Sequence, residues 1–167
     1  MKLIFIGDIF GSPGRKAIKE LLPAIVEEVQ PELVIANCEN AAAGAGITKK
    51  IYKEILSYGV DFLTSGNHIW NRPEIYSFIS DKDLKLIRPA NYPLGTPGLG
   101  WSIITTETGI RVGIVNLMGR VNLLNLNCPF LSADEAIREM SAQTDLIVVD
   151  FHAETTSEKV ALGWYLD

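Results

Sequence analysis

The chain has 167 residues, 47% of them hydrophobic, and its 20 acidic residues outnumber its 15 basic ones, which gives a formal net charge of −5. This length is typical of one domain with its own core, so we expect residues 1–167 to form a single domain. The negative charge excludes strong binding to a nucleic-acid backbone, because such binding needs a basic face.

Two cysteines, Cys38 and Cys128, make up the thiol content of the chain. They form no Cys-x-x-Cys pair, and they fit a reduced cytosolic protein better than a disulfide scaffold. The N-terminus leads directly into an apolar segment without a basic leader or a cleavage site. No apolar run is long enough to cross a bilayer. We therefore expect a soluble, cytoplasmic protein without a membrane partner.

Short apolar runs alternate with helical patterns in the first half of the chain. The runs have the pattern of strands covered on both faces, and they span residues 2–7, 33–37 and 60–64. Strand–helix–strand units of this spacing have right-handed crossovers. The pattern therefore predicts a parallel sheet in an α/β fold.

Two helices are predicted between these strands, and their ends carry recognisable signals. Ser12 is expected to cap the first helix, and Pro23 is expected to kink or restart it. Thr48 is expected to cap the second helix, which should end near Gly59. A further helix is expected to follow Pro73, after the turn that ends the third strand.

The second half begins with a Pro- and Gly-rich stretch, residues 81–100, which predicts a loop. Ser132 and Glu135 have the spacing of a capping box at the start of a helix. The remaining predicted elements are a β-hairpin over 101–106 and 111–116, a helix over 132–142, a buried strand over 145–151 and a final helix over 156–166.

Polar side chains follow four of the predicted strands: Asp8, Glu39, Asn40, Asn67, His68 and His152. The carboxyl ends of parallel strands form the edge where open α/β folds hold ligands, so we expect these groups to converge. Carboxylate, amide and imidazole donors suit manganese, iron or magnesium better than a thiolate-seeking ion. Such a donor set is what a two-metal phosphoester hydrolase requires, with hydroxide as the nucleophile and a protonated histidine as the proton donor.

Each of these residues also has a simpler explanation. Asp8 can end a strand, His68 can belong to a turn, and His152 can be a hydrogen-bonded core imidazole; only their joint occurrence at strand ends favours a site. Glu39 directly follows a buried strand and must be solvated or paired. The glycines near Asp8 lack the Gly-x-Gly-x-x-Gly spacing, and no Walker motif follows them.

Two further side chains have open roles at this stage. Trp70 either belongs to the core or stacks on a nucleobase beside His68. Arg120 either contacts a phosphate or lies on the surface.

Four sequence blocks resemble the successive motifs of the calcineurin-like metallophosphoesterases: Gly7-Asp8-Ile9-Phe10-Gly11, Asn37-Cys38-Glu39-Asn40-Ala41, Ser65-Gly66-Asn67-His68 and Asp150-Phe151-His152-Ala153-Glu154. Among these proteins they are most similar to the YmdB-type subfamily of bacterial 2′,3′-cyclic-nucleotide phosphodiesterases. The resemblance implies an α/β/β/α sandwich, two divalent metal ions and a small cyclic-nucleotide or phosphodiester substrate.

The resemblance also implies a role for each site residue. Asp8 would bind one metal with Asn40 beside it, and Glu39 would bridge both metals. Asn67 and His152 would bind the second metal. His68 would be the proton donor.

One departure from the family pattern is expected to matter. The family has a later Gly-x-His-x-His block, and this chain ends at Asp167 before any such block. We therefore expect a domain that is incomplete at its C-terminal end, with an incomplete metal site, low or no activity as it stands, and exposed sheet edges that favour homo-oligomers. The alternative is a non-catalytic binding or regulatory protein that keeps the fold.

Overall fold

The computed structural model describes all 167 residues, and its first half forms a parallel three-stranded sheet. The strands are β1 (Leu3–Ile6), β2 (Leu33–Asn37) and β3 (Phe62–Thr64), in the spatial order β1-β2-β3. They are joined by α1 (Gly11–Val29) and α2 (Lys49–Leu56). The predicted parallel sheet is confirmed, because both strand pairs, β1 with β2 and β2 with β3, are parallel.

The second half forms another three-stranded sheet with mixed pairing. Its strands are β4 (Trp101–Thr105), β5 (Arg111–Met118) and β6 (Ile147–His152). The predicted hairpin is confirmed, since β4 and β5 pair antiparallel, whereas β6 pairs with β5 in parallel. The helices of this half are α3 (Pro129–Ser141) and α4 (Thr156–Leu166).

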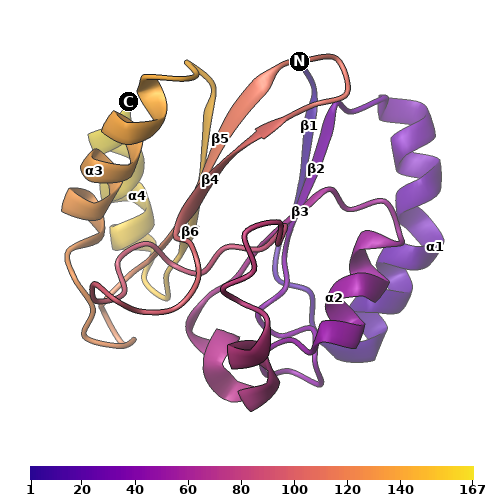
Figure 1. Ribbon diagram of the computed structural model, residues 1–167, viewed down its shortest axis with the longest axis horizontal. Helices are drawn as coiled ribbons and strands as arrows, with labels where there is room; N and C mark the ends of the chain where they lie inside the picture. The colour runs from indigo at the N-terminus through magenta and orange to yellow at the C-terminus, as the bar shows by residue number, and fades with distance from the viewer.

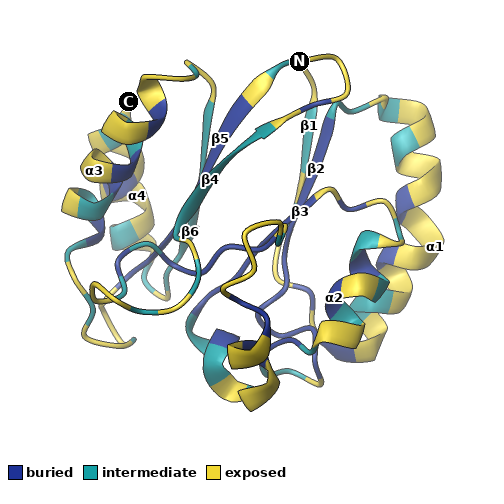
Figure 2. Ribbon diagram, viewed as in Figure 1, coloured by how far each residue is buried: buried dark blue, intermediate teal, exposed yellow.

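The two sheets pack face to face, with α1 and α2 outside the first sheet and α3 and α4 outside the second (Figure 1). Alternation along β2 builds two core layers, because successive side chains point to opposite faces of a strand. Leu33 and Ile35 join the layer between the sheets, whereas Val34 and Ala36 join the layer under α1 and α2. Buried residues fill these layers, and exposed residues cover the outer helix faces (Figure 2). The expected α/β/β/α sandwich is confirmed.

Helix α1 differs from its predicted form at two points. It begins at Gly11, one residue before Ser12, and its N-cap Phe10 makes no side-chain cap hydrogen bond. It also runs through Pro23 without a restart, so the predicted restart was wrong. The proline lies on the exposed side of the helix while Leu22 is buried against the sheet, and this packing holds the helix together where one backbone donor is missing.

The capping box at Ser132 was also a wrong prediction. Helix α3 begins three residues earlier, at Pro129, whose fixed φ suits the first helical position. The backbone N–H of Ser132 donates to the carbonyl of Cys128 at 3.1 Å, which places Ser132 inside the first turns of the helix. By contrast, the hydroxyl of Thr48 accepts from the N–H of Ile51 at 3.2 Å, as the predicted cap of α2 requires.

Instead of the helix expected after β3, two short 3₁₀ helices follow, η1 (Asn67–Asn71) and η2 (Pro73–Ser77). Pro73 has no backbone N–H, so a continuous helix through η1 and η2 would lack one backbone hydrogen bond at this residue. None of the helices combines the length and the apolar character needed to span a bilayer.

Candidate metal centre

Glu39 lies at the centre of the candidate site, two residues after the end of β2. Its side chain is only 2% exposed, and no lysine or arginine forms an ion pair with it. The groups around its carboxylate are the side chain of Asn40, the backbone N–H of His68 and two imidazoles. Loss of water around this carboxyl raises its pKa above the usual range, although the nearby His152 opposes the shift.

His152, the last residue of β6, reaches Glu39 from the second sheet. Its Nε2 atom lies 3.2 Å from Oε1 of Glu39 and 3.0 Å from Oδ1 of Asn67. Asn67 is the first residue of η1, directly after the turn that ends β3. A carboxylate oxygen, an amide oxygen and an imidazole nitrogen therefore meet at one point, although they come from three different strand ends.

Asp8 and His68 complete the cluster through Asn40. The amide nitrogen of Asn40 donates to Oδ2 of Asp8 at 2.6 Å and to Oε1 of Glu39 at 3.1 Å. Its amide oxygen lies 2.7 Å from Nδ1 of His68. That oxygen can only accept, so Nδ1 of His68 carries the proton and Nε2 has no hydrogen-bond partner in the protein.

The structure thus brings together all six side chains that the sequence singled out. One expectation needs correction, because the donors do not share the edge of a single sheet. Asp8, Glu39, Asn40, Asn67 and His68 follow strands of the first sheet, whereas His152 ends a strand of the second. The face-to-face packing of the sheets closes the gap between them (Figure 1).

Gly66 makes this close approach possible. A Cβ atom at this position would overlap the carboxylate of Glu39 and would lie 2.8 Å from Cδ2 of His152. The φ of Gly66, −157°, lies outside the left-handed region that favours glycine, so the requirement argued here is for space around its Cα. Only glycine lets the turn after β3 pass between these two side chains.

A second group of polar residues, to which the sequence patterns assigned no role, lies beneath the cluster. Asn37, Ser65, Asn116 and Asp150 lie between the two sheets and share hydrogen bonds. The available signal was their position in otherwise apolar segments: Asn37 ends β2, Ser65 directly follows β3, and Asn116 and Asp150 each lie two residues before the end of a strand.

The two side chains with open roles have other contacts. Trp70 stacks on Tyr76, with ring centroids 5.3 Å apart, and meets the edge of Tyr92. The Arg120 side chain is exposed, and its backbone N–H donates to Glu158. These contacts favour the packing role for Trp70 and the surface role for Arg120.

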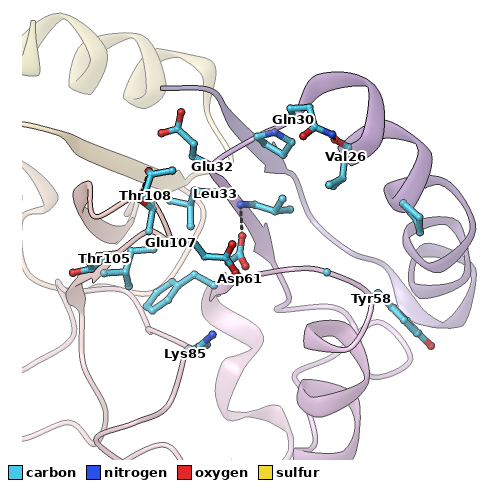
Figure 3. Close-up of a pocket in the computed structure, with 17 residues that line it drawn as sticks. Val26, Gln30, Glu32, Leu33, Tyr58, Asp61, Lys85, Thr105, Glu107 and Thr108 are labelled. Atoms are coloured by element: carbon cyan, nitrogen blue, oxygen red, sulfur yellow. Dashed lines mark hydrogen bonds between the residues drawn. The ribbon is translucent and has the colours of Figure 1, made fainter.

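A cavity of about 660 Å³ lies at the opposite end of the molecule, near the amino ends of β2 and β3 (Figure 3). Its lining includes three carboxylates, those of Glu32, Asp61 and Glu107, and the amine of Lys85. Asp61 is already engaged, because it accepts the backbone N–H of Val34 at 2.8 Å. None of the six site residues lines this cavity, so it is separate from the candidate metal centre.

The donor set at the strand ends fits divalent metal ions. A nearly fully buried carboxylate without a lysine or arginine partner is costly, and a bound cation is a usual way to compensate it. Hard oxygen donors and imidazole suit manganese, iron or magnesium. No group of three or more His, Cys, Asp and Glu side chains is arranged to hold a metal by itself, so a site here depends on the amides of Asn40 and Asn67.

The sandwich with this cluster at its strand ends defines a fold of the metallophosphoesterase type. A crystal structure of a Mycoplasma pneumoniae protein, described as a novel phosphatase, superposes with a TM-score of 0.90 at 35% identity; the match covers all of this chain and 60% of that one. A crystal structure of a hypothetical protein from Thermus thermophilus matches with a TM-score of 0.92 at 40% identity, over all of this chain and 64% of the other.

The chain belongs to the YmdB-like protein family, whose family model matches residues 4–167. A relative from Bacillus subtilis strain 168, named 2′,3′-cyclic-nucleotide 2′-phosphodiesterase, is 48% identical over the whole chain. The match covers 62% of that relative, so the chain spans about three fifths of the length of the curated relatives it matches. The resemblance found in the sequence blocks is confirmed.

Proposed function

We propose that this chain is a metal-dependent phosphodiesterase, or the part of one that carries most of the metal centre, and that it opens 2′,3′-cyclic nucleotides. The observation that carries the proposal is the buried Glu39 carboxylate, which lies among amide and imidazole donors without a lysine or arginine partner. The name of the Bacillus subtilis relative supports the substrate class. The inter-sheet core shared by both halves supports one domain over residues 1–167.

Five residues would hold two divalent ions. Glu39 would serve both, Asp8 and Asn40 would face one, and Asn67 and His152 would face the other. This division follows the contacts, since Asp8 contacts Asn40 and Asn67 contacts His152, with Glu39 between the two pairs. When bound, such ions supply a nucleophile from water at neutral pH and offset the charge on the phosphoryl oxygens.

In its doubly protonated form, with a proton on each ring nitrogen, His68 would donate the Nε2 proton to the leaving oxygen and keep the one on Nδ1. Its Nδ1 atom is held by the amide oxygen of Asn40, which orients the ring and leaves Nε2 to exchange a proton with a substrate. The side chain is 37% exposed, so a substrate can reach it. A positioned general acid of this kind typically contributes about 10²–10⁴-fold to a rate.

The test is hydrolysis of 2′,3′-cyclic AMP by the purified 167-residue chain in Mn²⁺, Fe²⁺ or Mg²⁺, with the phosphomonoester product identified by chromatography. We expect low turnover that is abolished in Glu39→Ala and retained in Glu20→Ala. Glu20 is a matched control, because its side chain is 59% exposed and its only ion pair is with Lys16 on the same helix. Absence of both metal binding and turnover would contradict the proposal.

A second candidate is a non-catalytic binding protein with the same fold. The observation that favours it is the lack of any group of three His, Cys, Asp or Glu side chains spaced to hold a metal. This candidate predicts a metal-free chain that still binds 2′,3′-cyclic AMP. Calorimetric titration with the nucleotide, with and without Mn²⁺, separates the two.

A further inference from the structure

A small polar network lies between the two sheets, directly beneath the candidate metal centre. Asn37, Ser65 and Asn116 are 4%, 0% and 0% exposed, and Asp150 joins them from β6. We propose that Asp150 is a positioning residue: it fixes the orientation of two asparagine amides, and these hold the backbone that presents Glu39 and the Asn67-His68 turn. The inference rests on the proposed function, because it assigns support to that same site.

One oxygen of the Asp150 carboxylate accepts hydrogen bonds from both amides. Its Oδ2 atom accepts from Nδ2 of Asn37 at 3.1 Å and from Nδ2 of Asn116 at 3.3 Å. Each asparagine therefore turns its NH₂ group toward Asp150 and its carbonyl oxygen away from it. One side chain on the second sheet thus sets the direction of an amide on each sheet.

The opposite end of each amide confirms the same orientation. Oδ1 of Asn37 accepts from the backbone N–H of Glu39 at 3.1 Å, and Oδ1 of Asn116 accepts from the backbone N–H of Ser65 at 3.2 Å. A backbone N–H can only donate, so the amide atom that faces it must be the oxygen. Both amides are therefore fixed from two sides, and a flipped amide would lose both contacts.

The backbone groups held in this way belong to the segments that carry the metal-binding candidates. Glu39 itself is held through Asn37, and Ser65 begins the turn that leads to Asn67 and His68. Asp150 precedes His152 by two residues on β6, so both side chains point to the same face of the strand. The network therefore connects three of the four strand ends that converge on the site.

Packing alone does not require polar residues at these positions. The residues that precede them on the same strand faces are Leu33, Ile35, Val112 and Ile114, all in the apolar layer between the sheets. On β2 the only amide that faces this layer is its last residue, Asn37. On β5 the only one is Asn116, next to the site. Burying amides and a carboxylate there costs desolvation that apolar residues would avoid, which is why we assign the network to positioning and not to stability.

The first experiment compares Mn²⁺ affinity with stability for Asn116→Leu, Asn37→Leu and a control, Ile114→Ala. Ile114 is fully buried two residues before Asn116 on the same face of β5. We expect both asparagine variants to bind Mn²⁺ about 10–100-fold more weakly by calorimetry, the usual loss when a group that orients metal ligands is removed. Ile114→Ala should lower stability in urea but keep Mn²⁺ affinity within about twofold, since it leaves these contacts in place.

A second measurement needs no metal and so separates this inference from the proposed function. In amide hydrogen exchange of the metal-free chain, Asn37→Leu should increase the exchange rate of the Glu39 backbone N–H. Asn116→Leu should increase that of the Ser65 backbone N–H. Asp150→Leu, which has a similar size but no side-chain acceptor, should increase exchange at both amides. If the wild-type chain bound no Mn²⁺, the proposed metal centre would be refuted. Amide hydrogen exchange would still test the role of the polar network. Folded variants with unchanged Glu39 and Ser65 protection would overturn the inference.

Discussion

Replacing Gly66 by alanine adds only one methyl group, but this small change should disturb the candidate metal centre. The added Cβ would overlap the Glu39 carboxylate and lie 2.8 Å from Cδ2 of His152. Neither neighbour can withdraw freely, because Glu39 is held by Asn40 and by the N–H of His68, and His152 contacts Asn67. The substitution therefore forces apart the two side chains whose donor atoms meet at 3.2 Å.

The size of the effect follows from this overlap. The cost that follows from the overlap is overpacking, typically about 1–3 kcal/mol. If the same free energy is lost from the arrangement of Glu39 and His152 that binds the metal, Mn²⁺ affinity decreases by about 5–150-fold. We expect the destabilisation in urea-induced unfolding of the metal-free chain and the loss of affinity in calorimetric titration.

Gly163→Ala is the matched control. Gly163 lies inside α4, and a Cβ there would have no heavy atom within 4 Å. Alanine at such a helical position should stabilise the chain by about 0.5–1 kcal/mol and leave Mn²⁺ binding unchanged. If Gly66→Ala proved as stable as the wild type and bound Mn²⁺ equally well, the close approach at Gly66 would not matter and the reasoning would be refuted.

Four other predictions concern individual side chains. His68→Ala should retain bound metal by elemental analysis but hydrolyse 2′,3′-cyclic AMP about 10²–10⁴-fold more slowly; an unchanged rate would exclude His68 as the proton donor. Glu39→Gln should lower the occupancy of both metals together in the same elemental analysis. Because burial raises the pKa of the Glu39 carboxyl above its ordinary value of 4.5, the folded metal-free chain binds this proton more tightly than the unfolded one. Glu39→Gln should therefore be the more stable metal-free chain at neutral pH, and its advantage should shrink as the pH falls toward 4.5 in urea titrations; an advantage independent of pH would contradict this assignment. Burial likewise raises the pKa of the Cys38 thiol, so a thiol reagent at neutral pH should modify Cys128 first and Cys38 only on unfolding; early modification of Cys38 would argue against its burial.

Local sequence patterns predicted most elements because the forces involved act over a few residues. The run Leu33–Asn37 became β2 with the expected bounds, and Thr48 caps α2 as its side chain allows. One failure occurred where tertiary packing outweighed a local signal, and another where a second local signal outweighed the first. Helix α1 continues through Pro23 because Leu22 anchors it to the sheet, and Ser132 lies inside α3 because Pro129 starts that helix earlier.

For the candidate site, the sequence by itself determined which polar side chains follow the strands, because an apolar run that ends in a carboxylate, amide or imidazole is visible without a structure. The tertiary structure alone decided how they meet. Asn37 and Asp150 are 113 positions apart and join across two sheets, and Gly66 is needed only because Glu39 and His152 approach it from different sheets. Such contacts depend on how the sheets stack, and sheet stacking follows from burial of the whole apolar layer and not from any local pattern.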